Sequence, residues 1–154
     1  MRRSDREITD ISEILSIVDR CKVIRLAMID GNRPYLVPLN FGYSYTEGTF
    51  TFYCHSAPEG RKLEVLQNNP VVFFEMDTDH ALISHELACS HSYRYSSIMG
   101  DGTVRFLDGD EKVHALEAIM LHQTGRSFSI SSERVSVVSV FAVEVSSLSA
   151  KSKK

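Results

Sequence analysis

The chain has 154 residues, of which 43% are hydrophobic and 24% are charged, values typical of one globular domain, 1–154, with a single core. Its net charge of −3 gives no general attraction to nucleic acid or to an anionic membrane surface. No apolar run approaches the ~20 residues of a membrane span, no signal peptide is expected because the first ten residues lack an apolar segment, and three cysteines without paired spacing argue against a disulfide framework. We therefore expect a cytoplasmic domain.

The first part of the chain predicts a helix followed by an antiparallel hairpin. Thr9 and Asp10 are candidate caps for a helix whose apolar face holds Ile11, Ile14, Leu15 and Val18. Residues 23–45 alternate between two faces around Asp30-Gly31, which is typical of a hairpin turn. Pro38 cannot donate a hydrogen bond to a neighbouring strand, so we expect the second strand to lie at an edge, or to bend there.

The remaining elements favour a mainly β fold. Residues 49–55 form a strand with Phe50, Phe52 and Cys54 on one face, and a short helix follows with Leu63, Val65 and Leu66 inward. A compact strand, a long strand broken by glycines 100 and 102, a helix and a β-branched final strand complete the chain. The predicted helix has Val113, Leu116, Ile119 and Met120 inward, whereas residues 78–92 show only weak periodicity. About six strands and three helices without βαβ alternation predict a small antiparallel barrel with short peripheral helices.

The stretch "FYCHSAPEGRK" combines hydrogen-bonding side chains with two adjacent cations where a strand runs into a helix. Ser56 and Glu59 have the spacing of a capping box, with Pro58 early in the turn. Arg61 and Lys62 then fall in the first turns, where cations are unfavourable unless an anion binds. Helix N-termini attract phosphate, and Arg and Lys are its usual partners. Two solvated surface cations are an equally good explanation of this pattern.

A second group of side chains points to a different chemistry. His80, His85, Cys89 and His91 fall within twelve residues, and imidazole with thiolate can bind zinc or haem. Their spacing matches no standard metal motif, so scattered surface histidines are the simpler interpretation. A nucleophile pair of Cys54 with His55 is excluded because neighbours on a strand point to opposite faces.

Taken in order, the pieces "RLAMIDGNRPYLVPLNFGY", "FYCHSAPEGRK", "NNPVVFFEMD", "YRYSSIMGDGTVRFL", "DEKVHALEAIM" and "FAVEVSSLSAKSKK" resemble the FMN-binding split-barrel family related to pyridoxamine 5'-phosphate oxidase. The nitroimidazole-resistance reductase-like branch is the more similar one. The resemblance implies a six-stranded antiparallel split β-barrel that forms a homodimer, with FMN sites built from both protomers at the interface.

The resemblance also assigns roles to residues. The strand Val37–Phe41 would run beside the isoalloxazine, with its backbone and Asn40 available to the polar edge of the ring. His55 and Ser56 would lie at the ribityl-phosphate end, and Arg61 and Lys62 would bind the phosphate. Tyr95, Ser96 and Ser97 of the "YRYSSIMG" strand would approach the flavin from the opposite protomer. The full set of expected FMN contacts is Val37, Pro38, Leu39, Asn40, Phe41, Tyr53, His55, Ser56, Arg61, Lys62, Tyr95, Ser96 and Ser97.

The expected function is that of an FMN-dependent oxidoreductase. A nicotinamide donor, NADH or NADPH, would reduce the flavin, and a small aromatic or nitroaromatic acceptor would take the electrons. His55 is the candidate catalytic proton donor, because the ordinary pKa of histidine lies near neutrality. One alternative is a non-catalytic module that stores or senses flavin or haem. Another is an oxidase of pyridoxamine phosphate, which is disfavoured because the sequence offers no second set of phosphate-binding arginines. No bound metal ion is expected.

Overall fold

One antiparallel sheet forms the body of the molecule in the computed structural model, which describes residues 3–131 and 135–154. Its strands follow the order β3-β2-β6-β7-β8-β5-β4, and a short β1 pairs with the end of β8. The strands are β1 (Glu7–Ile8), β2 (Ile24–Asp30), β3 (Arg33–Leu39), β4 (Phe41–Thr46), β5 (Thr49–Ser56), β6 (Val71–Ile83), β7 (Ser92–Leu107) and β8 (Ser139–Lys153). Edge strands β3 and β4 are not paired with each other, so the barrel is open.

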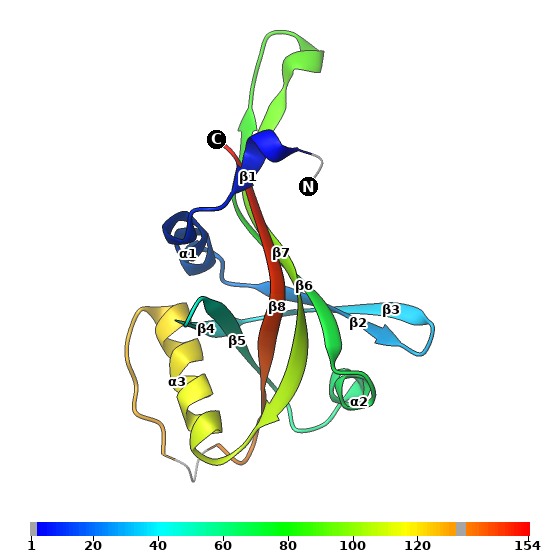
Figure 1. The fold of residues 1–154 in the computed structure, drawn as a ribbon, viewed down its shortest axis with the longest axis vertical. Coiled ribbons are helices and arrows are strands. Elements are labelled where there is room, and N and C mark those ends of the chain that lie inside the picture. The colour runs from blue at the N-terminus through cyan, green and yellow to red at the C-terminus, as the bar shows by residue number, and fades with distance from the viewer. Residues whose placement is uncertain (1–2, 132–134) are drawn as a thin grey trace.

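Three α-helices surround the sheet, as Figure 1 shows. They are α1 (Ile11–Arg20), α2 (Arg61–Asn68) and α3 (Gly109–Thr124), and two short 3-10 turns, Ser4–Arg6 and Ala88–Ser90, complete the described elements. Helix α3 packs on β4 and β5, whereas α2 lies beside β2 on the other side of the barrel. The prediction of an antiparallel split barrel with peripheral helices is confirmed. The described strands number eight rather than six, because β3 and β4 separate at Asn40 and because β1 is added.

The core lies inside the curled sheet and is rich in aromatic rings. Phe41, Phe52, Phe74 and Phe141 are all fully buried. The ring of Phe52 meets that of Phe41 edge-on at 5.6 Å and that of Phe74 at 5.2 Å. Each buried side chain of this size contributes ~1.5–3 kcal/mol to folding. The predicted inward face of β5 is therefore confirmed.

The β2–β3 hairpin follows its sequence pattern closely. Ile24, Leu26 and Met28 are buried, as alternation predicts. The two turn residues are Gly31 and Asn32 rather than Asp30 and Gly31, because Asp30 still pairs with Arg33 in the ladder. Strand β3 is an edge strand, which confirms the expectation from Pro38.

Strand β7 runs unbroken from Ser92 to Leu107, so the predicted break at its glycines is wrong. Gly100 instead permits a close approach, since a Cβ there would lie 2.1 Å from the Ser147 carbonyl oxygen and 2.6 Å from the Phe74 ring. The ladder between β7 and β8 continues past this point with one register shift, between Asp101 and Gly102. These glycines bring strands together rather than end one.

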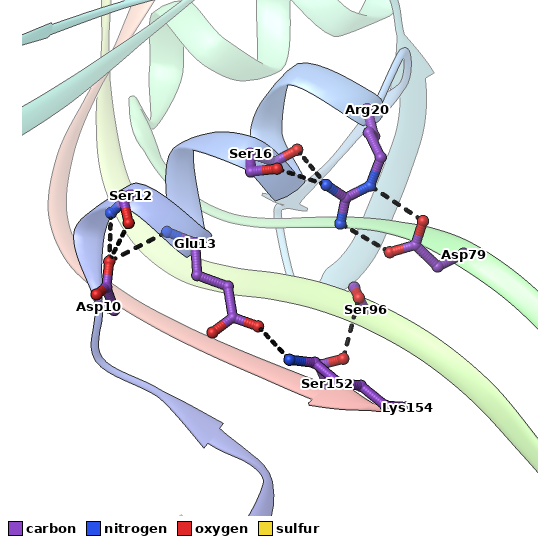
Figure 2. A network of polar contacts seen from close by, with 9 residues as sticks. All are labelled: Asp10, Ser12, Glu13, Ser16, Arg20, Asp79, Ser96, Ser152 and Lys154. Carbon is purple, nitrogen blue, oxygen red and sulfur yellow. Dashed lines mark hydrogen bonds and ion pairs between the residues drawn. The ribbon is translucent and has the colours of Figure 1, made fainter.

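Residues 79–95 form a two-stranded arm that extends β6 and β7 beyond the barrel (Figure 1). The ladder shifts register between Thr78 and Ala81, where Asp79 adopts a positive φ of 62°. This irregularity explains the weak periodicity of the sequence there. Arg20 of α1 holds the base of the arm through two bonds to the Asp79 carboxylate, at 3.0 and 2.8 Å (Figure 2).

Helix α1 begins as predicted, with Asp10 as its N-cap. The Asp10 carboxylate accepts hydrogen bonds from the backbone N–H groups of Ser12 and Glu13, at 2.7 and 3.2 Å (Figure 2). The predicted apolar face is shifted, because Ile14, Ile17 and Val18 are buried while Ile11 stays 40% exposed.

Helix α3 contacts β4 closely at Gly42. A Cβ at Gly42 would lie 2.4 Å from the carbonyl carbon of Ala118, so only glycine fits beneath the helix. The buried residues of α3 are Ala115 and Ile119. Of the four residues predicted to face inward, Ile119 is therefore confirmed, whereas the other three are only half-buried.

Candidate functional site

The corner between β5 and α2 has a different local structure from the predicted capping box. Helix α2 begins at Arg61 with Gly60 as its N-cap, at φ 134°, and no side chain caps it. Ser56 is the last residue of β5, and its Oγ donates a hydrogen bond to the Ala57 carbonyl at 2.9 Å. Glu59 lies two residues before the first residue of the helix, so it cannot reach back from the third helical position. The N–H groups of the first turn are therefore without a side-chain cap.

Arg61 is held by the tip of the β2–β3 hairpin. Its Nε and Nη2 atoms donate hydrogen bonds to Oδ2 of Asp30 at 2.8 and 2.6 Å, and the guanidinium lies 4.7 Å from the centre of the Tyr35 ring. The hydrogen bonds to Asp30 raise the pKa of Arg61. This ion pair could not be found from the sequence, because thirty-one residues separate its partners. The Nη1 atom of Arg61 takes no part in the hydrogen bonds to Asp30.

Lys62, the second residue of α2, is half-buried. Burial lowers the pKa of Lys62, and the side chain interacts electrostatically with Cys54 and His55. Within the described chain it forms no ion pair with a carboxylate. A cation taken partly out of water without a charged partner favours an incoming anion.

His55 and Cys54 point to opposite faces of β5, as the sequence predicts. Cys54 is fully buried, and its burial raises the pKa of the thiol to about 12. His55 is exposed, yet partial desolvation lowers its pKa and Lys62 lowers it further. The neutral imidazole is therefore the favoured form near pH 7. This lowered pKa disfavours the charged form that a proton donor needs.

The predicted flavin-facing strip, Val37–Phe41, lies where β3 gives way to β4. Pro38 is exposed, while Val37 and Leu39 are half-buried against the core and Phe41 is fully buried. The Asn40 amide donates hydrogen bonds to the Lys22 carbonyl at 3.1 Å and to Gln123 at 3.3 Å. Its NH₂ group is thus used inside the chain, which leaves the backbone as the accessible polar part of the strip.

Tyr53 lies on the α3 side of β5, beside the ring of His114. Its hydroxyl forms a hydrogen bond with the Ser44 hydroxyl at 2.9 Å. The sequence does not reveal this contact, because it depends on the pairing of β4 with β5.

Tyr95, Ser96 and Ser97 lie far from the cationic corner of the same chain. Arg61 contacts Asp30 at one end of β2, whereas Arg25 on the same strand bonds Asp77, the register partner of Ser97. Five residues separate Asp30 from Arg25, which is ~17 Å of strand. One protomer therefore does not bring the two groups of predicted contacts together.

The surroundings of these three residues are polar. Ser97 is 5% exposed, and its hydroxyl has no hydrogen-bond partner in the described chain. It lines a depression of about 340 Å³ together with Glu75, Asp77, His80, Tyr93, Tyr95, Met99 and Lys151. Ser96 instead donates to the Ser152 hydroxyl at 3.2 Å, beneath α1 (Figure 2). A buried hydroxyl without a partner is uncommon and points to a missing neighbour.

The histidine-rich segment forms part of the arm. His80 lies 2.9 Å from an oxygen of Asp77, and His91 contacts the Leu87 carbonyl at 3.3 Å. Among residues 3–131 and 135–154, no three His, Cys, Asp or Glu side chains are grouped as a metal site would require.

The open antiparallel barrel, with its uncapped cationic helix entrance, defines a split-barrel protein. The sequence profile of the family described as Pyridoxamine 5'-phosphate oxidase matches residues 10–152. The chain therefore belongs to the pyridoxamine 5'-phosphate oxidase family, which confirms the resemblance drawn from its motifs.

Solved structures agree with this assignment. A protein from Bacteroides thetaiotaomicron assigned to 5-nitroimidazole antibiotic resistance is 38% identical, over 95% of this chain and 86% of its own, with a TM-score of 0.81. An FAD- and haem-binding protein from Mycobacterium smegmatis has a TM-score of 0.80 at 16% identity, over 97% of this chain and 74% of its own. An FAD-binding protein from Mesorhizobium loti has a TM-score of 0.66 at 21% identity, over 97% and 98%. The latter two show the fold alone.

No curated protein matches the chain. In the part of the chain that the structure describes, every helix is too short or too polar to cross a bilayer.

Proposed function

We propose that the chain is an FMN-dependent oxidoreductase that works as a homodimer and reduces a small aromatic or nitroaromatic acceptor with electrons from a nicotinamide donor. The observation that carries this proposal is the entrance of α2. An uncapped helix N-terminus, the half-buried ammonium of Lys62 and the guanidinium of Arg61 converge there. This set of donors fits one terminal phosphate monoester, which is the anionic end of FMN.

Two observations support the homodimer. The buried Ser97 hydroxyl has no partner among the described residues, and the Tyr95–Ser97 segment lies at the other end of β2 from the Arg61 contact. A second copy, related by twofold symmetry, would place its Tyr95–Ser97 segment opposite the first copy's β3 strip. Exposed apolar side chains on the outer sheet face support this contact, since Leu36 is 56% and Phe73 is 44% exposed.

Different residues would hold the phosphate, align the flavin ring and contact the acceptor. Arg61 and Lys62 hold the phosphate, and the backbone of the Val37–Phe41 strip aligns the ring system. Bound FMN supplies the hydride and electron transfer. His55 lies beside Lys62 with a lowered pKa, so it acts mainly as a neutral hydrogen-bond donor toward an acceptor. Proton transfer from His55 would then require the minor, protonated form.

Flavin retention tests the cofactor site. The double variant Arg61→Ala with Lys62→Ala should lose its flavin absorbance after incubation with FMN and desalting, whereas the wild type keeps it. Lys112→Ala is the matched control, because Lys112 lies on α3, away from the corner. Lys153 is a poorer control, since it is the β8 register partner of Tyr95. Equal retention by the double variant and the control would refute the site.

Turnover is tested separately. Anaerobic addition of NADH or NADPH should bleach the bound flavin, and a nitroimidazole should restore its colour. Yellow protein that neither nucleotide bleaches would contradict the oxidoreductase and support a flavin-storing module. Elution as a monomer at micromolar concentration, measured by light scattering with FMN bound, would refute the shared site.

A further inference from the structure

A cavity of about 860 Å³ lies against α3, which is on the other side of the barrel from α2 and the cationic corner. It is bounded by α1, β4, α3 and the segment that follows α3. Apolar and aromatic side chains form most of its wall, with Leu15, Tyr43, Tyr45, Leu121 and Phe128 among them. Leu121 is 49% and Phe128 is 44% exposed, so two large apolar groups at this cavity are still uncovered. These dimensions suit a small organic molecule.

The electrostatics of the cavity favour a cation. Two carboxylates, Asp19 and Glu117, line it against one ammonium, Lys22. The C-terminal ends of α1 and α3 also meet there, since the Lys22 ammonium donates hydrogen bonds to the Asp19 carbonyl at 3.0 Å and to the His122 carbonyl at 2.6 Å. Each helix end carries a partial negative charge of ~0.5. A single lysine therefore faces two carboxylates and two negative helix ends.

Two histidines, His114 and His122, also line this cavity. His114 is exposed, and the more buried one, His122, does not restore the balance. The Nε2 atom of His122 lies 2.8 Å from the Cys21 carbonyl oxygen, so it carries the hydrogen, and the ring packs against Phe41 at 4.6 Å and Tyr43 at 5.4 Å. Burial lowers the pKa of His122, which keeps the ring neutral near pH 7. The cavity thus retains an excess of negative charge within an aromatic wall.

The two carboxylates are held in place by the fold. Asp19 accepts a hydrogen bond of 2.6 Å from the Tyr43 hydroxyl, and this contact, after burial, raises the pKa of Tyr43. Glu117 accepts a hydrogen bond of 3.0 Å from the backbone N–H of Ile130, which fastens the segment after α3. Both carboxylates keep further lone pairs for a ligand.

We propose that this cavity binds a small organic cation, namely a primary amine carried on an aromatic or aliphatic body. The ammonium would lie between Asp19 and Glu117, over the faces of the tyrosine rings. The body would cover Leu121 and Phe128. This proposal is independent of the flavin, because none of the residues expected to contact FMN lines the cavity.

Three phenyl-bearing ligands of similar size and different charge test the proposal. Phenethylamine, 2-phenylethanol and 3-phenylpropionate are titrated into the protein, and backbone amide shifts are followed by NMR. We expect saturable binding of the amine, with shifts centred on Tyr43, Leu121 and Phe128. The amine should bind about tenfold more tightly than the alcohol, a difference of ~1.4 kcal/mol, and the acid should not bind.

Charge removal completes the test. Asp19→Asn with Glu117→Gln keeps both hydrogen-bond acceptors, so the fold is retained while amine affinity should fall by about tenfold or more. Glu47→Gln, in the exposed β4–β5 turn, is the matched control and should bind the amine like the wild type. Leu121→Trp, which fills the rim, should also weaken the amine. Absence of saturation, equal affinity for amine and alcohol, shifts elsewhere on the protein, or undiminished binding by the double variant would each overturn the proposal.

Discussion

Replacement of Gly42 by alanine tests the contact that holds α3 on the barrel. The added Cβ would lie 2.4 Å from the Ala118 carbonyl carbon and from the Ile119 nitrogen, whereas ordinary contact starts at 3.4 Å. These are backbone atoms, so no side-chain rotation relieves the clash. Helix α3 would have to retreat by about 1 Å, which is a typical overpacking change costing ~1–3 kcal/mol.

The retreat has a second cost. Gln123, in the last turn of α3, donates hydrogen bonds to the Phe41 carbonyl at 2.8 Å and to the Lys22 carbonyl at 3.2 Å. Weakening both adds ~1 kcal/mol or more. We therefore expect Gly42→Ala to lower the free energy of unfolding by ~2–4 kcal/mol, a large part of the ~5–15 kcal/mol of a domain. The melting temperature should fall by ~4–16 °C.

Urea unfolding followed by circular dichroism measures this effect. The control is Gly48→Ala, in the β4–β5 turn, where the Cβ meets nothing within 4 Å and only the positive φ of 84° opposes a side chain. That strain costs ~1–2 kcal/mol. A Gly42→Ala protein within 1 kcal/mol of the wild type, or no less stable than Gly48→Ala, would refute the close-packing argument.

Three further results are expected. Burial holds the pKa of His122 below its ordinary value of 6.5, so the contribution of the neutral ring to stability is complete above that pH and is lost as the pH drops below it. His122→Gln should flatten this decline in the free energy of unfolding, measured in urea between pH 7 and 5, and an unchanged dependence on pH would contradict the argument. Asp30→Asn releases Arg61 and removes a negative charge from the corner, so FMN, followed by fluorescence quenching, should bind a few-fold more tightly, and weaker binding would show that Asp30 positions Arg61 instead. A disulfide reagent such as DTNB should label one thiol of three in the native protein, at exposed Cys89, and all three after unfolding; prompt native labelling of the two buried thiols would contradict their burial.

The sequence predicted the class of fold because its strands alternate cleanly. Phe50, Phe52 and Cys54 face the core as expected, and Pro38 correctly marked an edge strand. Local signals failed where distant segments decide the geometry. The glycines of β7 lie in a continuous strand because Ser147 and Phe74 approach there.

In the candidate site, too, local patterns predicted some features, whereas contacts between distant segments decided others. Sequence placed Arg61 and Lys62 at a helix entrance, and both lie in the first turn of α2. The capping residues were wrong, since the helix starts after Gly60 rather than after Ser56. The hold of Asp30 on Arg61 and the use of the Asn40 amide by Gln123 depend on contacts between segments far apart in the chain. No local pattern reports such contacts.

The two prolines of β3 have a consequence for how the protein behaves in a crowded cell. Pro34 and Pro38 lack N–H groups and occupy alternate positions on either side of Leu36, so their nitrogens point to the same side of the strand. Since β2 pairs with all seven residues of β3, that side faces outward. The outward rim then offers carbonyl oxygens at three positions but a single N–H, at Leu36. An approaching strand would meet mostly repulsion between oxygens, which discourages fibril-like stacking while the barrel remains open.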